Sequence, residues 1–469
     1  MMGMRWRPVV IILVGLAACK QGPDYIPPPV AEFQQFRDST VTTESIANLT
    51  WWELFADTTL QALIATAVEG NRDVRIALAR IAEARAQAGF VRADLYPRVD
   101  IAGGVSATEA FNSDGSQVPV RDAFLAADVF YEVDLWGRIA RSNEAAAQEL
   151  LATEEAYRSI TLTLVSDLGS LYLLLRDLDA RQTISEETVE TRQEAVNILQ
   201  ARFDAGVISE VDVNQAQIEL ADAEAAVEVF KRLRAQTENA ISVLLGHTPE
   251  AIRRGLLLTE QTFPPEIPVG LPSDLVRRRP DILETERRLA AQTARIGVAE
   301  ALKFPSLSLT GSAGLSDDFT SGGLTSAVLN IGANLFGPLF NAGRNQRRVD
   351  IEVARTEQLL NRYEQTILTA FQEVEDAVVA VYTYRAEHAS RVRQLNAARN
   401  ATDLSWARYR GGMTSYLEVL DLQRSLFAAQ LATSETLQLQ LSSTVELYKA
   451  LGGGWPVRDS LWAVADSLP

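Results

Sequence analysis

The sequence predicts a mixed α+β membrane protein in which two structural repeats each supply a long helical hairpin and two strands of a β-barrel. Three observations lead to this prediction. The chain resembles itself at a spacing of 206 to 208 residues. Each copy contains a stretch of 66 residues without proline, and each also contains two short segments in which apolar and polar residues alternate. A helix of that length exceeds the needs of a single globular core, and the alternating segments suit strands that have lipid on one side.

The composition limits the classes of function open to the chain. Its 469 residues include one Cys and two His, and its net charge is −17. No internal disulfide can form with a single cysteine. His247 and His388 lie far apart with no CxxC or HExxH motif, so no metal site is expected. The negative charge argues against a nucleic-acid partner, because neutralising phosphates requires a basic face.

The N-terminus has the features of a bacterial secretory signal. Arg5 and Arg7 precede the apolar run VVIILVGLAA. That run is shorter than the ~20 residues that cross a bilayer. The ending LAAC, which closes at Cys19, resembles a lipobox, so we expect cleavage before Cys19 and acylation of its thiol. Lys20, rather than Asp, follows the cysteine, and in this respect the sequence resembles bacterial lipoproteins of the outer membrane. The alternative is an ordinary signal peptide with a cysteine beside the cut.

An internal repeat organises the rest of the chain. A shift of 206 residues pairs Gly206 with Gly412, and upstream a shift of 208 pairs Gly89 with Gly297. The segment between the copies contains five prolines, which rule out one continuous helix. The expected domains are a signal peptide (1–18), a lipidated N-terminal tether (19–50), repeat 1 (51–247), a Pro-rich equatorial linker (248–273), repeat 2 (274–453) and a C-terminal tail (454–469).

Each repeat is expected to begin with a helical segment. In repeat 1 this is one helix that runs from Leu60 through Ile64 and Ala67 to about Val91. Its apolar residues recur at helical spacing. The counterpart in repeat 2 is expected to begin near Asp274.

Two alternating segments follow in each repeat. In VDIAGGVSA, Val99, Ile101 and Val105 share one face, and Asp100 and Ser106 share the other. The same pattern recurs in residues 125–135, 307–315 and 327–335. Strands of about ten residues with one apolar and one polar face are typical of transmembrane barrels. The polar stretches FNSDGSQVPVRD and DDFTSGG are expected to be their outer loops.

The longest stretches predict two helical hairpins. Residues 138–203 and 344–409 contain no proline, and 66 residues of helix reach ~100 Å. Apolar residues in the first stretch have the four-three spacing of a coiled-coil seam, at Ile160, Leu164, Leu168, Leu171, Leu175 and Leu178. After Gly206 and Gly412 the chain is expected to turn back into a second helix.

Four strands are too few to close a barrel. Open strand edges are not tolerated in lipid, so the chain is expected to pool its strands with copies of itself. A dimer gives about eight strands and a filled interior, whereas a trimer gives about twelve strands and room for a lumen. The strand count therefore favours three or more copies.

Five motifs carry a resemblance to a known family. They are WWELF.D, YEVDLWGRIARSNEAA, IPVGLPSDLVRRRPDI, PLFNAGRNQRR and RYRGGMTSYLEVLD. From Cys19 to about Gly452 the chain resembles the TolC-like outer membrane efflux factors, in their lipoprotein (NodT/OprM-like) branch. The resemblance implies a homotrimer with a twelve-stranded barrel, four strands from each chain. That barrel lies in the outer membrane of a Gram-negative-type bacterium and continues as a periplasmic α-helical barrel of coiled-coil hairpins.

The resemblance also implies a function. Such a protein is a passive efflux duct and not an enzyme. It exports small molecules or drugs that arrive through a periplasmic adaptor from an inner-membrane transporter, expected to be proton-driven. The chain has no GxxxxGK[ST] motif, so the energy must come from the partner. A duct for type I protein secretion and a periplasmic coiled-coil scaffold lipoprotein without a pore remain alternatives. No cofactor is expected besides the covalent lipid on Cys19.

The hairpin tips are the candidate functional sites. Two repeats in each of three chains place six similar tips around one axis, which explains why the tip motif is written twice. The residues expected to contact the adaptor are Gly206, Val207, Ser209, Gly412, Met413 and Ser415.

A periplasmic gate is expected just after the second tip. Glu418 and Asp421 are three residues apart and can face the same side of a helix. Rings of such carboxylates repel one another until they take up protons or a cation. By the resemblance, acidic residues at these positions line the channel constriction. Some members of the family place an arginine where Thr414 stands here. The sequence therefore does not identify the groups that hold this gate shut. The alternatives are two ordinary solvated carboxylates, or a gate at the first tip.

Overall fold

The computed structural model describes residues 20–29, 52, 55–111, 117–262, 276, 278–318 and 326–453. The predicted signal peptide, Cys19, most of the tether, the ends of both outer loops and the C-terminal tail lie outside these residues. The chain forms two compact units, each assembled from separate stretches. Unit 1 comprises Met1–Val30, Ala79–Glu155 and Glu284–Gln365, and unit 2 comprises Ala31–Leu78, Ala156–Leu283 and Thr366–Pro469.

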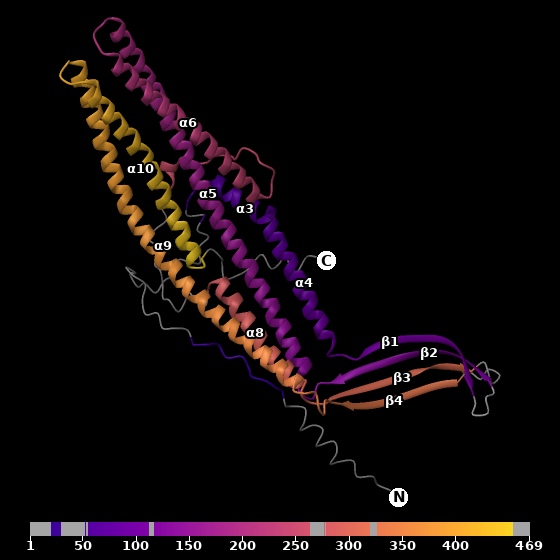
Figure 1. Cartoon of the computed structure of the whole chain (residues 1–469). Coiled ribbons are helices and arrows are strands. Elements are labelled where there is room, and N and C mark those ends of the chain that lie inside the picture. Colours follow the sequence, from indigo (N-terminus) through magenta and orange to yellow (C-terminus); the bar gives the residue numbers. More distant parts are fainter. Residues whose placement is uncertain are drawn as a thin grey trace. The chain divides into compact units, whose positions relative to one another are not determined.

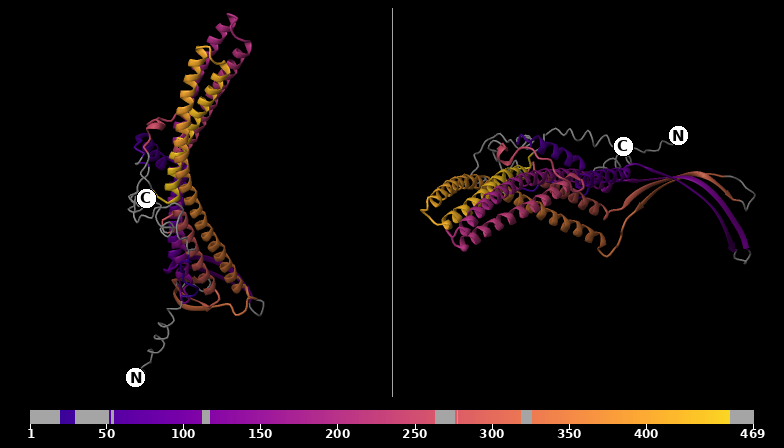
Figure 2. Two further views of the ribbon diagram at one scale, coloured as in Figure 1. Left: turned by 90° about the vertical axis from the view of Figure 1, so that its left-hand side faces the viewer. Right: turned by 90° about the horizontal axis from the view of Figure 1, so that it is seen from above.

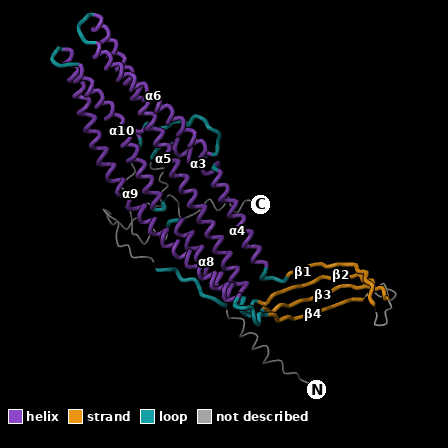
Figure 3. Tube along the Cα trace, viewed as in Figure 1, coloured by secondary structure: helices purple, strands orange, loops and turns teal. Residues whose placement is uncertain are grey.

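Unit 1 contains a single antiparallel sheet. Its strands are β1 (Arg98–Phe111), β2 (Gln117–Val133), β3 (Ser306–Asp318) and β4 (Ser326–Phe336). They lie in the order β1-β2-β3-β4, side by side in Figure 1 and drawn in orange in Figure 3. Within the described residues, β1 and β4 each have a single strand neighbour.

The register of the sheet confirms the predicted faces. Residues directly opposite one another in an antiparallel pair lie on the same face. One row across the four strands is apolar, and the next is polar. The apolar row is Ile101, Ala127, Ala313 and Leu329, and the polar row is Asp100, Asp128, Ser312 and Asn330.

The two faces of the sheet differ in exposure. On β3, Leu309, Ala313 and Leu315 are exposed, whereas Ser312 and Gly314 between them are partly buried. The strands curve, as Figure 2 shows. On β4, residues of both faces are exposed, apart from Gly332.

The predicted strand bounds are corrected at both ends. The expected length of about ten residues is too short, because backbone pairing in β1 and β2 continues to Phe111 and Gln117, within the stretch predicted as a loop. β2 also ends at Val133, before the predicted Leu135. Here Asp134 leaves the strand to cap the next helix, accepting hydrogen bonds from the backbone N–H groups of that helix at 3.1 and 2.7 Å.

The predicted opening helix of repeat 1 is wrong as a single element. It is two helices, α3 (Thr58–Gly70) and α4 (Arg72–Ala93). They are separated by Asn71, which has the extended angles φ −61 and ψ 135. The Asn71 side chain accepts from the N–H groups of Asp73 and Val74 at 2.8 and 3.2 Å and donates to the Leu244 carbonyl at 2.9 Å. Asn71 therefore starts a new helix and ties it to a neighbour.

The counterpart in repeat 2 is α8. It runs over Pro280–Ala301. Asp274, where it was expected to begin, lies outside the described residues. Proline suits the first position of a helix because it has no N–H group to leave unpaired. At the other end of α8, Phe304 stacks on Trp136 with ring centroids 4.6 Å apart, which joins the end of β2 to the start of β3.

The two long hairpins match the prediction to within a residue. The first hairpin is α5 (Arg138–Asp204) with α6 (Glu210–Leu245), and the second is α9 (Arg344–Arg410) with α10 (Tyr416–Ala450). All six residues of the predicted seam on α5 are buried or partly buried. In unit 2, all of them except Leu178 join a core that includes Leu60 and Ile64 of α3 and Leu441 and Val445 of α10. One 18-residue window of α5 has a mean hydropathy of 1.2, and 56% of it is buried, as in a core helix.

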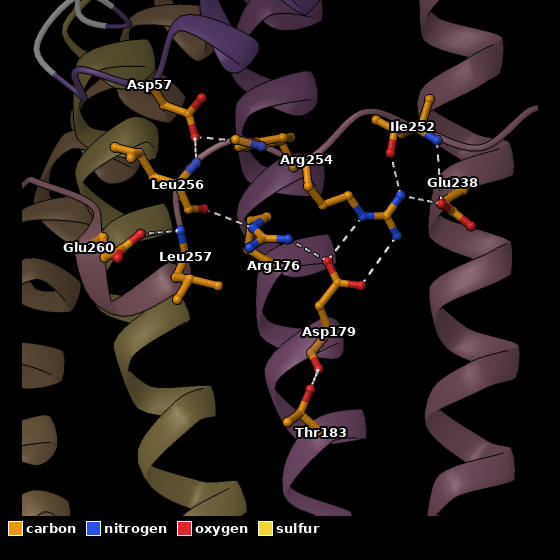
Figure 4. A network of polar contacts seen from close by, with 12 residues as sticks. Asp57, Arg176, Asp179, Thr183, Glu238, Ile252, Arg254, Leu256, Leu257 and Glu260 are labelled. Carbon is orange, nitrogen blue, oxygen red and sulfur yellow. Dashed lines mark hydrogen bonds and ion pairs between the residues drawn. The ribbon is translucent and has the colours of Figure 1, made fainter. Parts of the chain in front are cut away.

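The linker after α6 belongs to unit 2, where polar contacts hold it against α3, α5 and α6. Arg254 pairs with Asp179 of α5 at 3.1 Å and with Glu238 of α6 (Figure 4). Asp57, which caps α3, accepts a hydrogen bond from the N–H of Leu256 at 3.1 Å. The linker contains the short 3-10 helix η2 (Leu258–Glu260). As far as the structure describes it, the linker is otherwise without helix.

Candidate functional site

The two hairpin tips have the same backbone. Gly206 and Gly412 have φ values of +73 and +70, a region that residues other than glycine seldom adopt. The N–H groups of Val207 and Met413 return to the carbonyl five residues earlier, at 2.9 Å in both tips. This is the usual glycine-terminated end of a helix. A Cβ built on either glycine meets no atom within 4 Å, so a larger side chain there would point into open space.

All six residues predicted to contact an adaptor are exposed at the tips. Val207 and Met413 are 71% and 68% exposed, which is unusual for apolar side chains. The prediction missed Val211 and Leu417, which are 60% and 51% exposed one turn further along. They are equivalent under the 206-residue shift, and that shift was the signal that would have found them. The tips therefore offer paired apolar contacts.

An aromatic cluster joins the two hairpins just behind the tips. Trp406, Tyr409 and Tyr416 lie with ring centroids 5.5 to 6.1 Å apart. They pack with Leu199 of α5 and Val213 of α6. Burial raises the pKa of Tyr416 to about 12, so its hydroxyl stays neutral. Because these rings pack on both helices of the first hairpin, the second tip rests on that hairpin.

The two predicted gate carboxylates have different surroundings. Glu418 accepts a hydrogen bond from the Thr414 hydroxyl and pairs with Arg408 at 3.1 Å. Asp421 is 69% exposed and lies 3.6 Å from Arg424. Thr414 therefore contacts Glu418, one of the two predicted gate residues. A gating role for either carboxylate stays a prediction.

A buried ion-pair network links the hairpins below the tips. Arg192 of α5 pairs with Glu219 of α6 at 3.2 Å, and Arg424 of α10 pairs with the same carboxylate at 2.5 Å. The Arg192 and Glu219 side chains are only 3% and 7% exposed, and Arg192 also lies over the Phe427 ring at 5.1 Å. We call Arg192, Glu219 and Arg424 the tip brace. Burial lowers the pKa of Arg192, and the Glu219 carboxylate opposes that effect.

The sequence prediction missed the tip brace. Its members lie far apart in the chain, and no short motif contains them. A signal existed in the departures from the repeat: Arg192 and Glu219 have Ala398 and Ser425 as their equivalents. A buried charge present in one copy alone is a candidate for a contact between the copies.

Two other predictions concern lipid and metal. Cys19 lies outside the described residues, and the description begins at Lys20 beside it. Among the residues that the structure describes, no group of three or more His, Cys, Asp or Glu side chains is placed to hold a metal ion.

Comparison with known proteins places the chain in a family. The model of the family described as outer membrane efflux protein matches residues 63–247 and 271–453. The chain is 37% identical over 456 residues to the probable efflux pump outer membrane protein TtgC of Pseudomonas putida, covering 94% of this chain and 93% of that protein. It is 32% identical over 449 residues to the cation efflux system protein CusC of Escherichia coli, covering 94% and 98%. Among solved structures, the outer-membrane channel OprN matches with a TM-score of 0.88 at 30% identity, covering 93% of this chain and all of that one.

Proposed function

This chain belongs to the outer membrane efflux protein family, and from that premise we propose that three copies of it form one continuous duct. As a member of this family it is an outer-membrane efflux channel with a helical part in the periplasm, and not an enzyme. The observation that carries the proposal is the four-stranded sheet, which has one apolar and one polar face and whose described outer strands, β1 and β4, have a single strand neighbour each.

Closing the sheet with copies of itself accounts for both outer strands. Lipid does not tolerate an open strand edge. If β4 of one chain pairs with β1 of the next, three copies give 3 × 4 = 12 strands, enough to surround a lumen. The apolar rows then face lipid, and the polar rows face water inside the barrel.

The tips are the proposed docking surface for a periplasmic adaptor. They carry exposed apolar side chains at Val207, Val211, Met413 and Leu417 on a backbone that is the same in both repeats. The adaptor in turn connects the duct to an inner-membrane transporter, which supplies the energy. Glu418 and Asp421, beside this surface, are the proposed gate.

Small organic compounds are the proposed substrates. Identity to the probable efflux pump protein TtgC is higher than to the cation efflux protein CusC, at 37% against 32%. The chain has only four Met, two His and one Cys, so it offers few of the soft ligands that bind transition-metal ions. Cations are the second candidate, because acidic residues such as Asp100 and Asp128 lie on the polar face of the sheet.

The proposed anchor is an acyl group on Cys19, added after removal of residues 1–18. The sequence LAAC followed by Lys20 supports it. Mass spectrometry of the mature protein checks this point directly. We expect an N-terminal Cys19 that carries acyl mass, and an unmodified cysteine would contradict the lipobox assignment.

The duct is tested by its assembly and its conductance. The full chain, extracted from outer membranes in mild detergent, should have the mass of three copies and should form channels in planar bilayers. A monomeric or dimeric particle without conductance would contradict the proposal and favour a scaffold without a pore.

Adaptor docking is tested at the tip glycines. Gly206→Phe combined with Gly412→Phe should abolish efflux in a host that supplies the adaptor and transporter, while trimers persist. The matched control is Gly206→Ala with Gly412→Ala, which has the same unfavourable φ but little bulk, and it should keep most of the efflux. Loss of trimers before loss of efflux would make these glycines structural only.

A further inference from the structure

The first described residues of the chain lie docked against unit 1. Lys20 pairs with Glu144 of α5 at 2.5 Å. The N–H of Gln21 donates to the carbonyl of Trp136 at 3.1 Å, three residues after β2 ends. Further along, the hydroxyl of Tyr25 lies 3.4 Å from Glu286 of α8. We call residues 20–25 the N-terminal strap.

A buried arginine holds the strap. The Arg141 side chain is only 1% exposed. It donates to the carbonyls of Gln21 and Gly22 at 3.0 Å each, and to the Asp24 carboxylate at 2.8 Å. Its remaining contact is Glu144 at 3.0 Å. Without the strap, most of the donors of this buried charge would have no partner, which is a costly arrangement.

Two glycines let the strap approach the helix α8. Gly22 has φ +84, and a Cβ on it would lie 2.4 Å from the Cα of Gly297. A Cβ on Gly297 would lie 2.6 Å from the Gln21 carbonyl oxygen. Glycine weakens a helix interior, so a glycine at this place in α8 calls for a packing reason. The strap provides one.

The repeat supplies an internal control for the positions that contact the strap. Arg141 and Glu144 correspond to Arg347 and Asp350, which form the same pair at 3.1 Å. Yet the Arg347 side chain is 82% exposed. A chain with two copies has only one N-terminus, so only one copy can receive it.

The glycines differ between the repeats in the same way. Gly297 corresponds to Gly89, and Gly137 corresponds to Gly343. A Cβ on Gly137 would lie 2.9 Å from the Lys20 side chain, whereas a Cβ on Gly89 or Gly343 meets nothing within 4 Å. The crowded positions are therefore those beneath the strap.

We propose that Arg141 and Gly297 form a docking site for the N-terminal strap, and that this docking fixes the segment next to the proposed lipid anchor against α5 and α8. The inference rests on the proposed acylation and outer-membrane location. Cys19 is bonded to Lys20, so their Cα atoms lie ~3.8 Å apart. The strap also joins α5 to α8, where the two repeats meet in unit 1.

Burial and hydrogen bonding at the docking site agree with a charged Glu144. Burial raises the pKa of Glu144, but the hydrogen bonds from Lys20 and Arg141 outweigh it and lower this pKa below its usual value. Glu144 therefore remains ionised at neutral pH and keeps both cations in place.

The test is trypsin cleavage after Lys20 in the full-length protein purified in mild detergent, followed by mass spectrometry of the N-terminus. A docked strap protects this bond. Arg141→Met, Gly297→Ala and Gly22→Ala should each raise the cleavage rate at least tenfold. The equivalents Arg347→Met and Gly89→Ala should leave it unchanged.

The outcomes separate the docking site from the proposed function. Gly22→Ala changes the strap alone, so it remains informative if a helix variant fails to fold. Unchanged cleavage in Gly22→Ala and Arg141→Met, or equal cleavage in Arg347→Met, would overturn the docking site even if trimers and conductance are normal. Absence of acyl mass on the uncut protein would instead overturn the acylation.

Discussion

The two hairpin tips share one backbone but pair their side chains differently. In the first tip, the Ser209 hydroxyl accepts from the N–H of Val211 at 3.2 Å, and the Asp212 carboxylate accepts from the N–H of Ser209 at 3.3 Å. In the second tip, Ser415 makes no such side-chain cap. Glu418, the equivalent of Asp212, binds Thr414 and Arg408 instead. The first tip therefore uses its acid to build the helix, and the second has an acid available for another role.

The contrast extends below the tips. Glu219 of the tip brace corresponds to Ser425, and Arg424 corresponds to Ile218, which is 62% exposed. The charges that join the hairpins thus come from positions where the copies disagree. Duplication supplies the shape of the duct, and divergence between the copies supplies the contacts that can control it.

The largest expected effect comes from breaking the tip brace. Glu219→Ala leaves the buried Arg192 with only the exposed Asp222 at 3.7 Å as an ion-pair partner, and breaking a buried pair in this way costs up to about 3–5 kcal/mol. The equivalent substitution in repeat 2, Ser425→Ala, should have little effect. Hydrogen exchange of the α6 and α10 amides near the tips measures both. Equal protection in the two variants would mean that the brace does not join the hairpins.

In the strands, unlike in the tips, the two repeats agree. Ile101 and Leu309 are equivalent and both lie on the apolar face. Ile101→Arg and Leu309→Arg should each cost roughly 2–4 kcal/mol near the bilayer midplane and should reduce assembly equally. Ser308→Arg, on the polar face, is the control and should be tolerated. Detergent-resistant trimers on gels report the result, and equal damage from Ser308→Arg would contradict the assigned faces.

A smaller effect distinguishes the two caps. Ser209→Ala removes a side-chain cap and should destabilise the start of α6 by about 1 kcal/mol. Ser415→Ala removes no such bond and should change the stability of the start of α10 by a few tenths of a kcal/mol at most. Amide exchange in the first turn of each helix provides the measurement. A larger loss of amide protection in Ser415→Ala than in Ser209→Ala would contradict the assigned difference between the two caps.

Local patterns in the sequence predicted the long elements well. The bounds of α5 and α9 were found to within a residue because no proline interrupts either stretch and a glycine follows each. The strand faces were found because alternation is a local property. The break at Asn71 was missed because the same residue also binds the distant Leu244 carbonyl, a tertiary contact that no local pattern reveals.

The candidate site was predictable where it depends on the repeat, and not where it depends on contacts between the copies. Gly206 and Gly412 were found because the duplication marks them. Arg192 was missed because its partner Glu219 lies 27 residues away on the other helix of the first hairpin, and Arg424 comes from the second hairpin. The docked strap was missed for the same reason, since the sequence predicted only a lipidated tether over residues 19–50.

The proposed gate lies at the second tip, whereas the first tip provides shape, and single-channel conductance in planar bilayers distinguishes these two roles. The double variant Glu418→Gln, Asp421→Asn removes both carboxylates of the second tip, and Asp212→Asn is the control in the first. The double variant should raise the closed-state conductance or remove its dependence on pH and divalent cations, whereas the control should not. An unaltered closed-state current with the same cation response would contradict the claim and place the gate at the first tip, near Asp204, Glu210 and Asp212.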